Sequence, residues 1–233
     1  MGSLGHDDRV VFFFDIDNCL YAKSTKVHDH MARLINEFVV NHLSLTPEEG
    51  YVLHQQYYKD YGLAIEGLSR HHKIEPLVFN REVDDALPLD ELLKPDPKVR
   101  EVLERFDKSK VKMWLFTNAH ITHGQRVVRL LGIEDLFEGI TFCDYSQPRL
   151  VPKPLPAMFD KAEQEAKATD YDKIYFVDDS MLNCKEAYKR GWKRTVHLVE
   201  PQVPEPEEKP CEYQISSLQQ LLDLFPELLK TGT

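Results

Sequence analysis

The segment Val10-Val11-Phe12-Phe13-Phe14-Asp15-Ile16-Asp17-Asn18 decides how this chain is expected to fold. Its first five residues are apolar and favour a β-strand buried on both faces, as strands of parallel sheets are. Asp15 and Asp17 follow directly, and carboxylates two residues apart on an extended chain project to the same side. Two such charges about 4 Å apart repel by roughly 4 kcal/mol at an effective dielectric of about 20. We therefore expect the fold to supply them with a cation or a shared proton.

Length and charge limit the class of protein. The 233 residues suffice for one large α/β domain with a small insertion. The net charge of −10 argues against a partner that is a nucleic-acid polymer, because binding one needs clustered lysine and arginine. No apolar run approaches the ~20 residues of a membrane span, so we expect no membrane partner. The first eight residues lack the basic and apolar regions of a signal peptide.

The four cysteines are scattered, without the spacing of a metal site or a redox motif. Reduced thiols in a cytoplasmic protein are the expected reading of this pattern. The sequence leaves a nuclear location open as well.

Residues 23–95 show helical rather than strand patterns. Apolar residues from Met31 to Phe38 recur at the spacing of one helix face. Thr46-Pro47 is typical of the start of a second helix, and Gly62 of its end. Two shorter helices are expected at residues 65–71 and 82–87. This segment therefore predicts a helical insertion placed directly after the first strand.

From residue 96 onward, strand and helix patterns alternate. Further strands are predicted at residues 111–116, 139–142, 174–177 and 195–199. Parallel neighbours need crossover connections, so this alternation predicts an α/β fold with a Rossmann-like parallel sheet. We divide the chain into an α/β core (1–22 and 96–200), a helical insertion (23–95), and a linker with a C-terminal helix that packs on the core (201–233).

Polar residues stand at the carboxyl ends of these strands, or at the start of the helix that precedes the fourth strand: Asp15, Asp17, Thr117, Asn118, Lys153, Asp178 and Asp179. Ligands of open α/β sheets bind at this edge, so we expect these side chains to converge. Oxygen ligands without His or Cys suit Mg²⁺ together with a substrate phosphate. An aspartate can attack phosphorus, and a second carboxyl can protonate the leaving oxygen and then deprotonate water.

Four motifs in this order resemble those of the haloacid dehalogenase superfamily of phosphatases: Asp15-Ile16-Asp17-Asn18, Leu115-Phe116-Thr117-Asn118, Lys153-Pro154 and Val177-Asp178-Asp179-Ser180. The helical insertion is similar to that family's cap domain of the first type (C1). Cys19 departs from the family, whose members usually carry Thr there. Asp17 matters more, because members that cleave carbon–halogen bonds lack this second Asp.

The resemblance implies a role for each motif residue. Asp15 would be the nucleophile and Asp17 the general acid/base. The side chain of Asp15, the carbonyl of Asp17 and the carboxylate of Asp179 would bind Mg²⁺, with Asp178 acting through water. In addition, the phosphate would be bound by Thr117, Asn118 and Lys153, of which Lys153 also contacts the nucleophile.

A narrower resemblance, to the pyrimidine 5′-nucleotidase branch of fungi and plants, rests on the segments 13–21, 57–62, 131–140 and 176–179. It implies hydrolysis of a nucleoside monophosphate such as UMP or CMP. Tyr58 and Tyr61 could then stack on the base, and His123 could reach the phosphate or sugar. Packed tyrosines and a solvated helix face are the alternatives at these positions.

Three other functions stay open. A sugar-phosphate phosphatase or a phosphomutase of the same superfamily would carry the same four motifs. A phosphorylatable signalling domain without turnover also combines paired acids, Thr and Lys in a parallel sheet, although it lacks a long helical insertion after the first strand.

Overall fold

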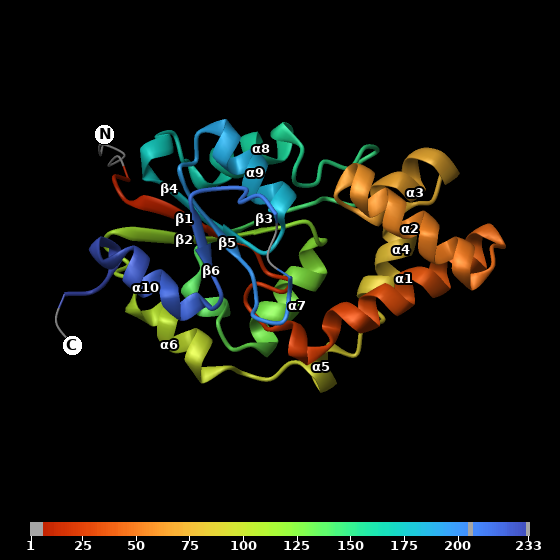
Figure 1. Ribbon diagram of the computed structural model, residues 1–233, viewed down its shortest axis with the longest axis horizontal. Coiled ribbons are helices and arrows are strands. Elements are labelled where there is room, and N and C mark those ends of the chain that lie inside the picture. The colour runs from red at the N-terminus through yellow and green to blue at the C-terminus, as the bar shows by residue number, and fades with distance from the viewer. Residues whose placement is uncertain (1–6, 205–206, 232–233) are drawn as a thin grey trace, which may run out of the picture.

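The computed structural model describes residues 7–204 and 207–231, which form a six-stranded sheet with helices around it (Figure 1). The strand order is β3-β2-β1-β4-β5-β6, and every neighbouring pair is parallel. The strands are β1 (Val10–Phe14), β2 (Val111–Thr117), β3 (Ile140–Phe142), β4 (Ile174–Asp178), β5 (Arg194–Leu198) and β6 (Tyr213–Ile215). This sheet confirms the predicted Rossmann-like fold class.

Helices cover both faces of the sheet. On one face lie α6 (Pro97–Arg105), α7 (Ile121–Leu130) and α10 (Leu221–Leu224). The other face carries α8 (Pro156–Ala166) and α9 (Met181–Arg190). Each face therefore has its own apolar layer, and the sheet is shielded on both sides, as a parallel sheet requires.

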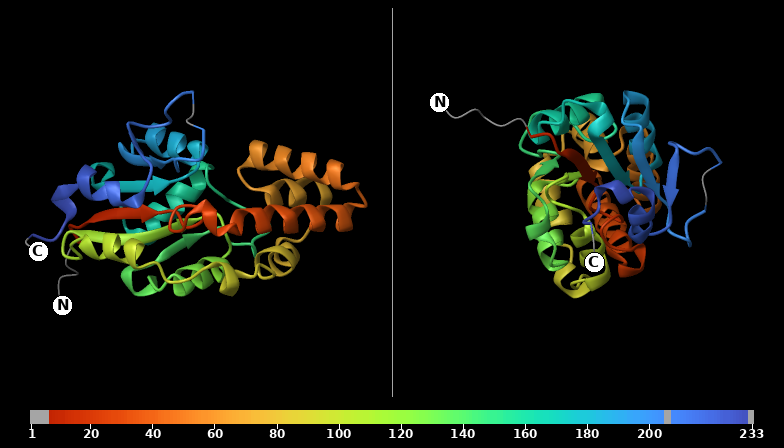
Figure 2. Two further views of the ribbon diagram at one scale, coloured as in Figure 1. Left: turned by 60° about the horizontal axis from the view of Figure 1, so that its bottom comes forward. Right: turned by 90° about the vertical axis from the view of Figure 1, so that its left-hand side faces the viewer.

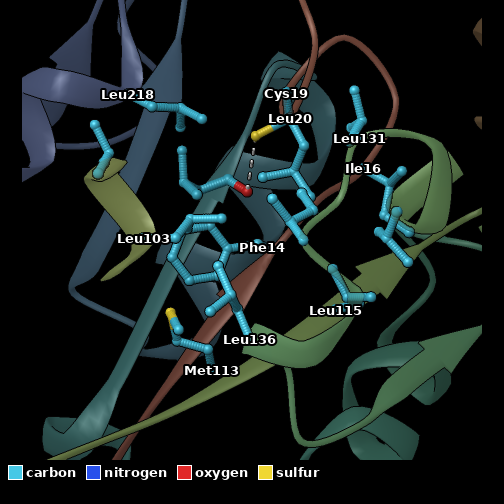
Figure 3. Close-up of a cluster of buried hydrophobic side chains, with 14 of the residues drawn as sticks. Phe14, Ile16, Cys19, Leu20, Leu103, Met113, Leu115, Leu131, Leu136 and Leu218 are labelled. Carbon is cyan, nitrogen blue, oxygen red and sulfur yellow. Dashed lines mark hydrogen bonds between the residues drawn. The ribbon is translucent and has the colours of Figure 1, made fainter. Parts of the chain in front are cut away.

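The central strand β1 belongs to both apolar layers, because alternate residues of a strand point to opposite faces. Phe12 and Phe14 enter one layer, whereas Phe13 stacks on Trp192 in the other, with ring centroids 5.0 Å apart. Figure 3 shows the first layer, which includes Phe14 of the strand and Cys19 of the turn that follows it. Packing on both faces fixes the position at which the chain leaves β1.

A second group of helices lies beside the carboxyl ends of the strands. Its members are α1 (Val27–Leu43), α2 (Pro47–Tyr61), α3 (Ala64–His72) and α4 (Pro76–Phe79), followed by a π-helical turn (Asn80–Asp84) and α5 (Leu89–Leu92). Figure 2 shows α1, α2 and α3 side by side, away from the sheet. We call α1 to α4 with the π-helical turn the helical group.

The ends of α2 follow the predicted local signals. The Thr46 hydroxyl accepts a hydrogen bond from the backbone N–H of Glu49, and the Glu49 carboxylate accepts one from the backbone N–H of Thr46. This capping box satisfies two donors that a helix start leaves unpaired. At the other end, Gly62 adopts a left-handed conformation with φ of 75°, which stops the helix.

The C-terminal segment differs from the prediction of a linker followed by one helix. Tyr213–Ile215 adds β6 to the sheet. The helix predicted through Leu218 and Phe225 forms as a 3₁₀ turn (Leu218–Gln220) that continues into α10, and a second 3₁₀ turn follows at Pro226–Leu228. Helical conformation ends at Phe225, because a residue before proline is disfavoured in the helical region. Residues 205–206 of the predicted linker lie outside the described residues, as do residues 1–6.

Two further findings concern the environment of the chain. All four cysteines are free and buried, as expected for reduced thiols. Within the described residues, no helix combines the length and the apolar character needed to cross a bilayer.

Candidate active site

Lys153 lies at the centre of the polar cluster at the carboxyl edge of the sheet. Its side chain is buried, and Nζ donates hydrogen bonds to Oδ1 of Asp15 (2.7 Å), Oδ2 of Asp178 (2.7 Å) and the carbonyl oxygen of Phe116 (2.6 Å). These contacts use all three N–H donors of the ammonium. Burial opposes its charge, but the two carboxylates outweigh burial and raise the pKa of Lys153. A charged Lys153 therefore joins the ends of β1, β2 and β4.

Asp15, Asp178 and Asp179 form a compact group of acids. One carboxylate oxygen of each lies within 4.8 Å of the others. Burial raises the pKa of Asp15 well above its usual value, with Lys153 opposing and the neighbouring carboxylates adding to the rise. Burial and the charge of Asp178 raise the pKa of Asp179 to about 7. When ionised, the three acids carry more negative charge than the neighbouring Lys153 and Lys23 balance, which favours a bound cation.

The two neighbouring acids of this group differ in their contacts. Oδ1 of Asp178 accepts hydrogen bonds from the backbone N–H two residues on (2.8 Å) and from the Asn183 amide (3.1 Å). Oδ2 of Asp178 accepts from Lys153 and again from Asn183 (3.1 Å). Asp179 forms an ion pair with Lys23 at 3.6 Å, and its side chain is 20% exposed. Asp179 therefore keeps oxygen lone pairs available, whereas Asp178 is committed to holding Lys153.

The donor set of this group fits Mg²⁺, which prefers a few carboxylates and keeps several waters. No His or Cys belongs to the cluster of Asp15, Asp178 and Asp179. Excess negative charge, a half-buried position and oxygen-only donors all point to a hard divalent cation.

Thr117 and Asn118, both predicted to bind phosphate, end β2 beside Lys153. Oδ1 of Asn118 accepts a hydrogen bond from the backbone N–H of Lys153 (2.6 Å), and Nδ2 donates to the Lys153 carbonyl (2.9 Å). The Asn118 side chain is thus used to fix the Lys153 backbone. The buried Thr117 hydroxyl accepts from the backbone N–H of Ala119 (3.0 Å), which bends the chain toward α7.

Asp17 has two side-chain partners, Tyr21 and His123. The Tyr21 hydroxyl and Nε2 of His123 each lie 2.7 Å from Oδ1 of Asp17. Burial would raise the pKa of Asp17, but the charge of His123 and both hydrogen bonds outweigh it and lower this pKa. Burial likewise opposes the charge of His123, yet Asp17 and Asp84 raise the pKa of His123 to about 9. His123 therefore pairs with Asp17, an acidic side chain of the site.

Tyr58 and Tyr61 occupy different places in the helical group. Tyr58 is 51% exposed, yet burial of its hydroxyl and the nearby charges of Asp179, Asp178 and Asp15 raise the pKa of Tyr58 to about 12. The hydroxyl of Tyr61 pairs with Nε2 of His71 (2.6 Å), and the Arg70 guanidinium lies over its ring. Tyr58 thus borders the acidic cluster, whereas Tyr61 is engaged by its neighbours on α3.

The structure shows the side-chain partners of two residues whose contacts the sequence left open, Tyr21 and Asn183. Tyr21 stands four residues after Asp17, and only the turn that follows β1 brings the two side chains together. Asn183, on the first turn of α9, contacts both oxygens of Asp178. Asp84 had no sequence signal at all, because its nearness to His123 depends on how the helical group meets α7.

Comparison with known proteins gives a consistent picture. The family model described as "haloacid dehalogenase-like hydrolase" matches residues 10–185. "Phosphate metabolism protein 8" of Saccharomyces cerevisiae is 40% identical over 200 residues, which are 82% of this chain and 62% of that protein. The chain thus spans less than two thirds of the length of this yeast relative.

Solved structures share the fold at low sequence identity. CbbY of Rhodobacter sphaeroides, in complex with xylulose 1,5-bisphosphate, is 16% identical with a TM-score of 0.67, covering 91% of this chain and 96% of that one. YfnB of Bacillus subtilis, bound to magnesium, is 14% identical with a TM-score of 0.58, covering 93% and 98%. At such identities the likeness concerns the fold alone.

Proposed function

The chain belongs to the haloacid dehalogenase-like hydrolases, and on this premise we propose that it hydrolyses phosphomonoesters through an aspartyl-phosphate on Asp15, with Mg²⁺ as cofactor. One observation carries the proposal. The buried ammonium of Lys153 lies 2.7 Å from Asp15 and 2.7 Å from Asp178, so that motifs far apart in the sequence meet at one point. This arrangement supports attack on a phosphate by Asp15 beside the positive charge of Lys153.

In the first proposed step, a carboxylate oxygen of Asp15 bonds to phosphorus while the bond to the leaving oxygen breaks. Asp17 gives its proton to that oxygen. In the second step water attacks the phosphorus, Asp17 takes the water proton, and the carboxylate of Asp15 leaves. Lys153 compensates negative charge on the nucleophile and on the phosphoryl oxygens throughout.

Asp15, the carbonyl of Asp17 and Asp179 would hold the Mg²⁺, with Asp178 behind them. The cation, when bound, would neutralise charge on the phosphoryl oxygens and so favour attack on phosphorus by the anionic Asp15. The geometry of Asp178, whose oxygens all meet protein donors, supports an indirect role for this residue. Thr117 would contribute to the phosphate pocket from the end of β2.

For the substrate we place pyrimidine nucleoside 5′-monophosphates first. An aromatic side chain can stack on a base, and Tyr58 is an exposed aromatic residue beside the acidic cluster. The helical group would act as the cap that covers the site and excludes water. Free thiols are compatible with a cytoplasmic enzyme that acts on a small phosphorylated metabolite.

A sugar phosphate is the second candidate substrate. The observation that favours it is the likeness in fold to CbbY, whose structure holds a sugar bisphosphate. A phosphate-release screen over nucleoside monophosphates and sugar phosphates decides between the two. We expect the highest kcat/KM for UMP or CMP, and a higher value for a sugar phosphate would replace this assignment. An isomeric product without free phosphate would identify a phosphomutase instead.

The change Asp15→Asn tests the proposed chemistry. An amide cannot attack phosphorus, so we expect phosphate release from p-nitrophenyl phosphate to fall to the rate without enzyme. Asp223→Asn, on the exposed side of α10, is the matched control and should keep the wild-type rate. An active Asp15→Asn enzyme would exclude the mechanism, whereas a stable aspartyl-phosphate without turnover in the wild type would favour a signalling domain.

A further inference from the structure

Both side-chain partners of Asp17 bind the same oxygen atom. Oδ1 lies 2.7 Å from the Tyr21 hydroxyl and 2.7 Å from Nε2 of His123. No hydrogen bond to Oδ2 of Asp17 is found among the described residues. The two oxygens of this carboxyl group are therefore unlike, although the group itself is symmetric.

The two donors approach Asp17 from different elements and are themselves held in place. Tyr21 belongs to the turn after β1 and is 6% exposed. His123 belongs to the first turn of α7, and its side chain is fully buried, whereas the side chain of Asp17 is 30% exposed. Asp17 therefore presents one oxygen to buried donors, while its side chain as a whole stays partly exposed. A substrate cannot easily reach the buried ring of His123.

We propose that Tyr21 and His123 are positioning residues, which hold Oδ1 of Asp17 so that Oδ2 is the atom that gives and takes the proton. This inference rests on the proposed phosphatase function. When a phosphoryl group moves to Asp15, the bond between phosphorus and the leaving oxygen breaks, and the proton on Oδ2 passes to that oxygen. When water attacks the aspartyl-phosphate, one water proton returns to Oδ2.

The two donors match Oδ1 in both protonation states of Asp17, although together they favour the charged carboxylate. An oxygen of a carboxylate has two lone pairs, and the carbonyl oxygen of the protonated acid has two as well. Oδ1 can therefore accept from Tyr21 and His123 before and after the proton moves. Since neither donor has to turn, the reorganisation that each step requires is small, which is how preorganised sites lower a barrier.

This assignment gives His123 a role different from contact with the substrate phosphate or sugar. A substrate contact predicts a higher KM at unchanged kcat, whereas a lost positioning contact lowers kcat and leaves KM in place. The two roles can thus be separated by steady-state kinetics.

The test compares Tyr21→Phe, His123→Gln and His123→Leu with the wild type. Phe keeps the buried ring and removes the hydroxyl alone, while Gln can place an amide donor near the position of Nε2. Tyr175→Phe is the matched control, because it also removes one hydroxyl from a buried tyrosine, and the partner of that hydroxyl, Glu227, belongs to none of the four motifs. The substrates are phenyl phosphate, whose leaving group needs a proton, and p-nitrophenyl phosphate, whose leaving group does not.

We expect Tyr21→Phe and His123→Leu to lower kcat for phenyl phosphate by roughly 10- to 100-fold, a part of the 10²- to 10⁴-fold typical of general acid–base catalysis. The loss should be smaller for p-nitrophenyl phosphate in the first step. Dephosphorylation still needs Asp17, so a burst of nitrophenolate equal to the enzyme concentration should precede slow turnover. His123→Gln should recover most of the rate.

Several results would overturn the inference. One is a kcat within twofold of the Tyr175→Phe control for Tyr21→Phe on both esters. Another is a rise in KM alone, which would return His123 to substrate binding. A wild type that releases no phosphate from either ester, by contrast, would refute the proposed function rather than this assignment.

Discussion

The ammonium of Lys153 is the residue-scale feature on which the geometry of the site depends. It is buried and contacts Asp15, Asp178 and the carbonyl of Phe116. Removing one partner of such a buried ion pair costs about 3–5 kcal/mol, because the remaining charges are left without compensation. The same contacts that orient the nucleophile therefore also stabilise the core at this edge of the sheet.

Sequence motifs predicted which residues meet at this point but not how each is held. Asp15, Lys153 and Asp178 follow from strand ends and from the family resemblance. The pairing of Asp17 with His123 joins residues 106 positions apart, and it depends on the angle at which α7 leaves β2. Side chains of ordinary type at ordinary helical positions, such as His123, carry no local signal of such a contact.

Asp84 gives a pH-dependent prediction. Burial raises the pKa of this carboxyl to about 7, with His123 opposing and Asp17 and Asp85 adding to the rise. In the unfolded chain this carboxyl loses its proton near the ordinary pKa of an aspartate, 3.8. Between pH 3.8 and about pH 7 only the folded state holds this proton, so the free energy of unfolding falls as pH rises. Above pH 7 the folded state bears the full cost of the buried carboxylate.

Asp84→Asn removes this cost, so the variant should gain stability over the wild type as pH rises. At pH 8 the gain should be on the order of 1–4 kcal/mol, and near pH 4 it should vanish. Urea unfolding at both pH values measures it, with Asp223→Asn as the control for loss of an exposed carboxylate. A difference between Asp84→Asn and wild type that is equal at both pH values would contradict the prediction.

At the scale of elements, the helices and strands with a strong local sequence pattern could be predicted, whereas those with a weak pattern could not. β1 and β4 are continuous apolar runs followed by acids, and both lie as predicted. β6 has three residues, of which only Ile215 is buried, and so short a strand forms because β5 offers a free edge. Periodicity predicted α1, α2 and α3 of the helical group but not α4. The short helix expected at residues 82–87 is instead the end of the π-helical turn at Asn80–Asp84 followed by a turn.

The contact between α2 and α3 depends on Gly67. A Cβ atom at this position would lie 2.2 Å from Cγ of Tyr57 on the facing helix. Gly67→Ala should therefore force the helices apart and lower the free energy of unfolding by about 1–3 kcal/mol, the usual cost of overpacking. Ser69→Ala, on the same helix, is the control. Equal stability of the two variants in urea unfolding would show that the close approach is not needed.

At the scale of the whole molecule, the chain carries a net charge of −10 and gathers acids at one edge of its sheet. A cation there would relieve repulsion and join the ends of β1 and β4, so its binding should stabilise the entire fold. A ligand whose free concentration is about 100 times its Kd adds ~2.7 kcal/mol to the free energy of unfolding.

We therefore expect Mg²⁺ to raise the melting temperature of the wild type, and chelation to reverse the rise. Asp179→Asn should lose most of this response, because Asp179 keeps oxygens free for the cation. Asp223→Asn should keep it. Thermal melts with and without Mg²⁺ check the prediction independently of activity, and an Asp179→Asn protein that responds like the wild type would contradict the assignment of this ligand.

The central claim is that residues from three strand ends and one loop meet to transfer a phosphoryl group to Asp15. It is tested most directly with Asp17→Asn, which cannot deprotonate water and should stop after the first step. Acid quenching after p-nitrophenyl phosphate is added, followed by peptide mass spectrometry, should find one phosphoryl group on the peptide that contains Asp15. Phosphate on another residue, or release of free phosphate with no modified peptide, would contradict the account.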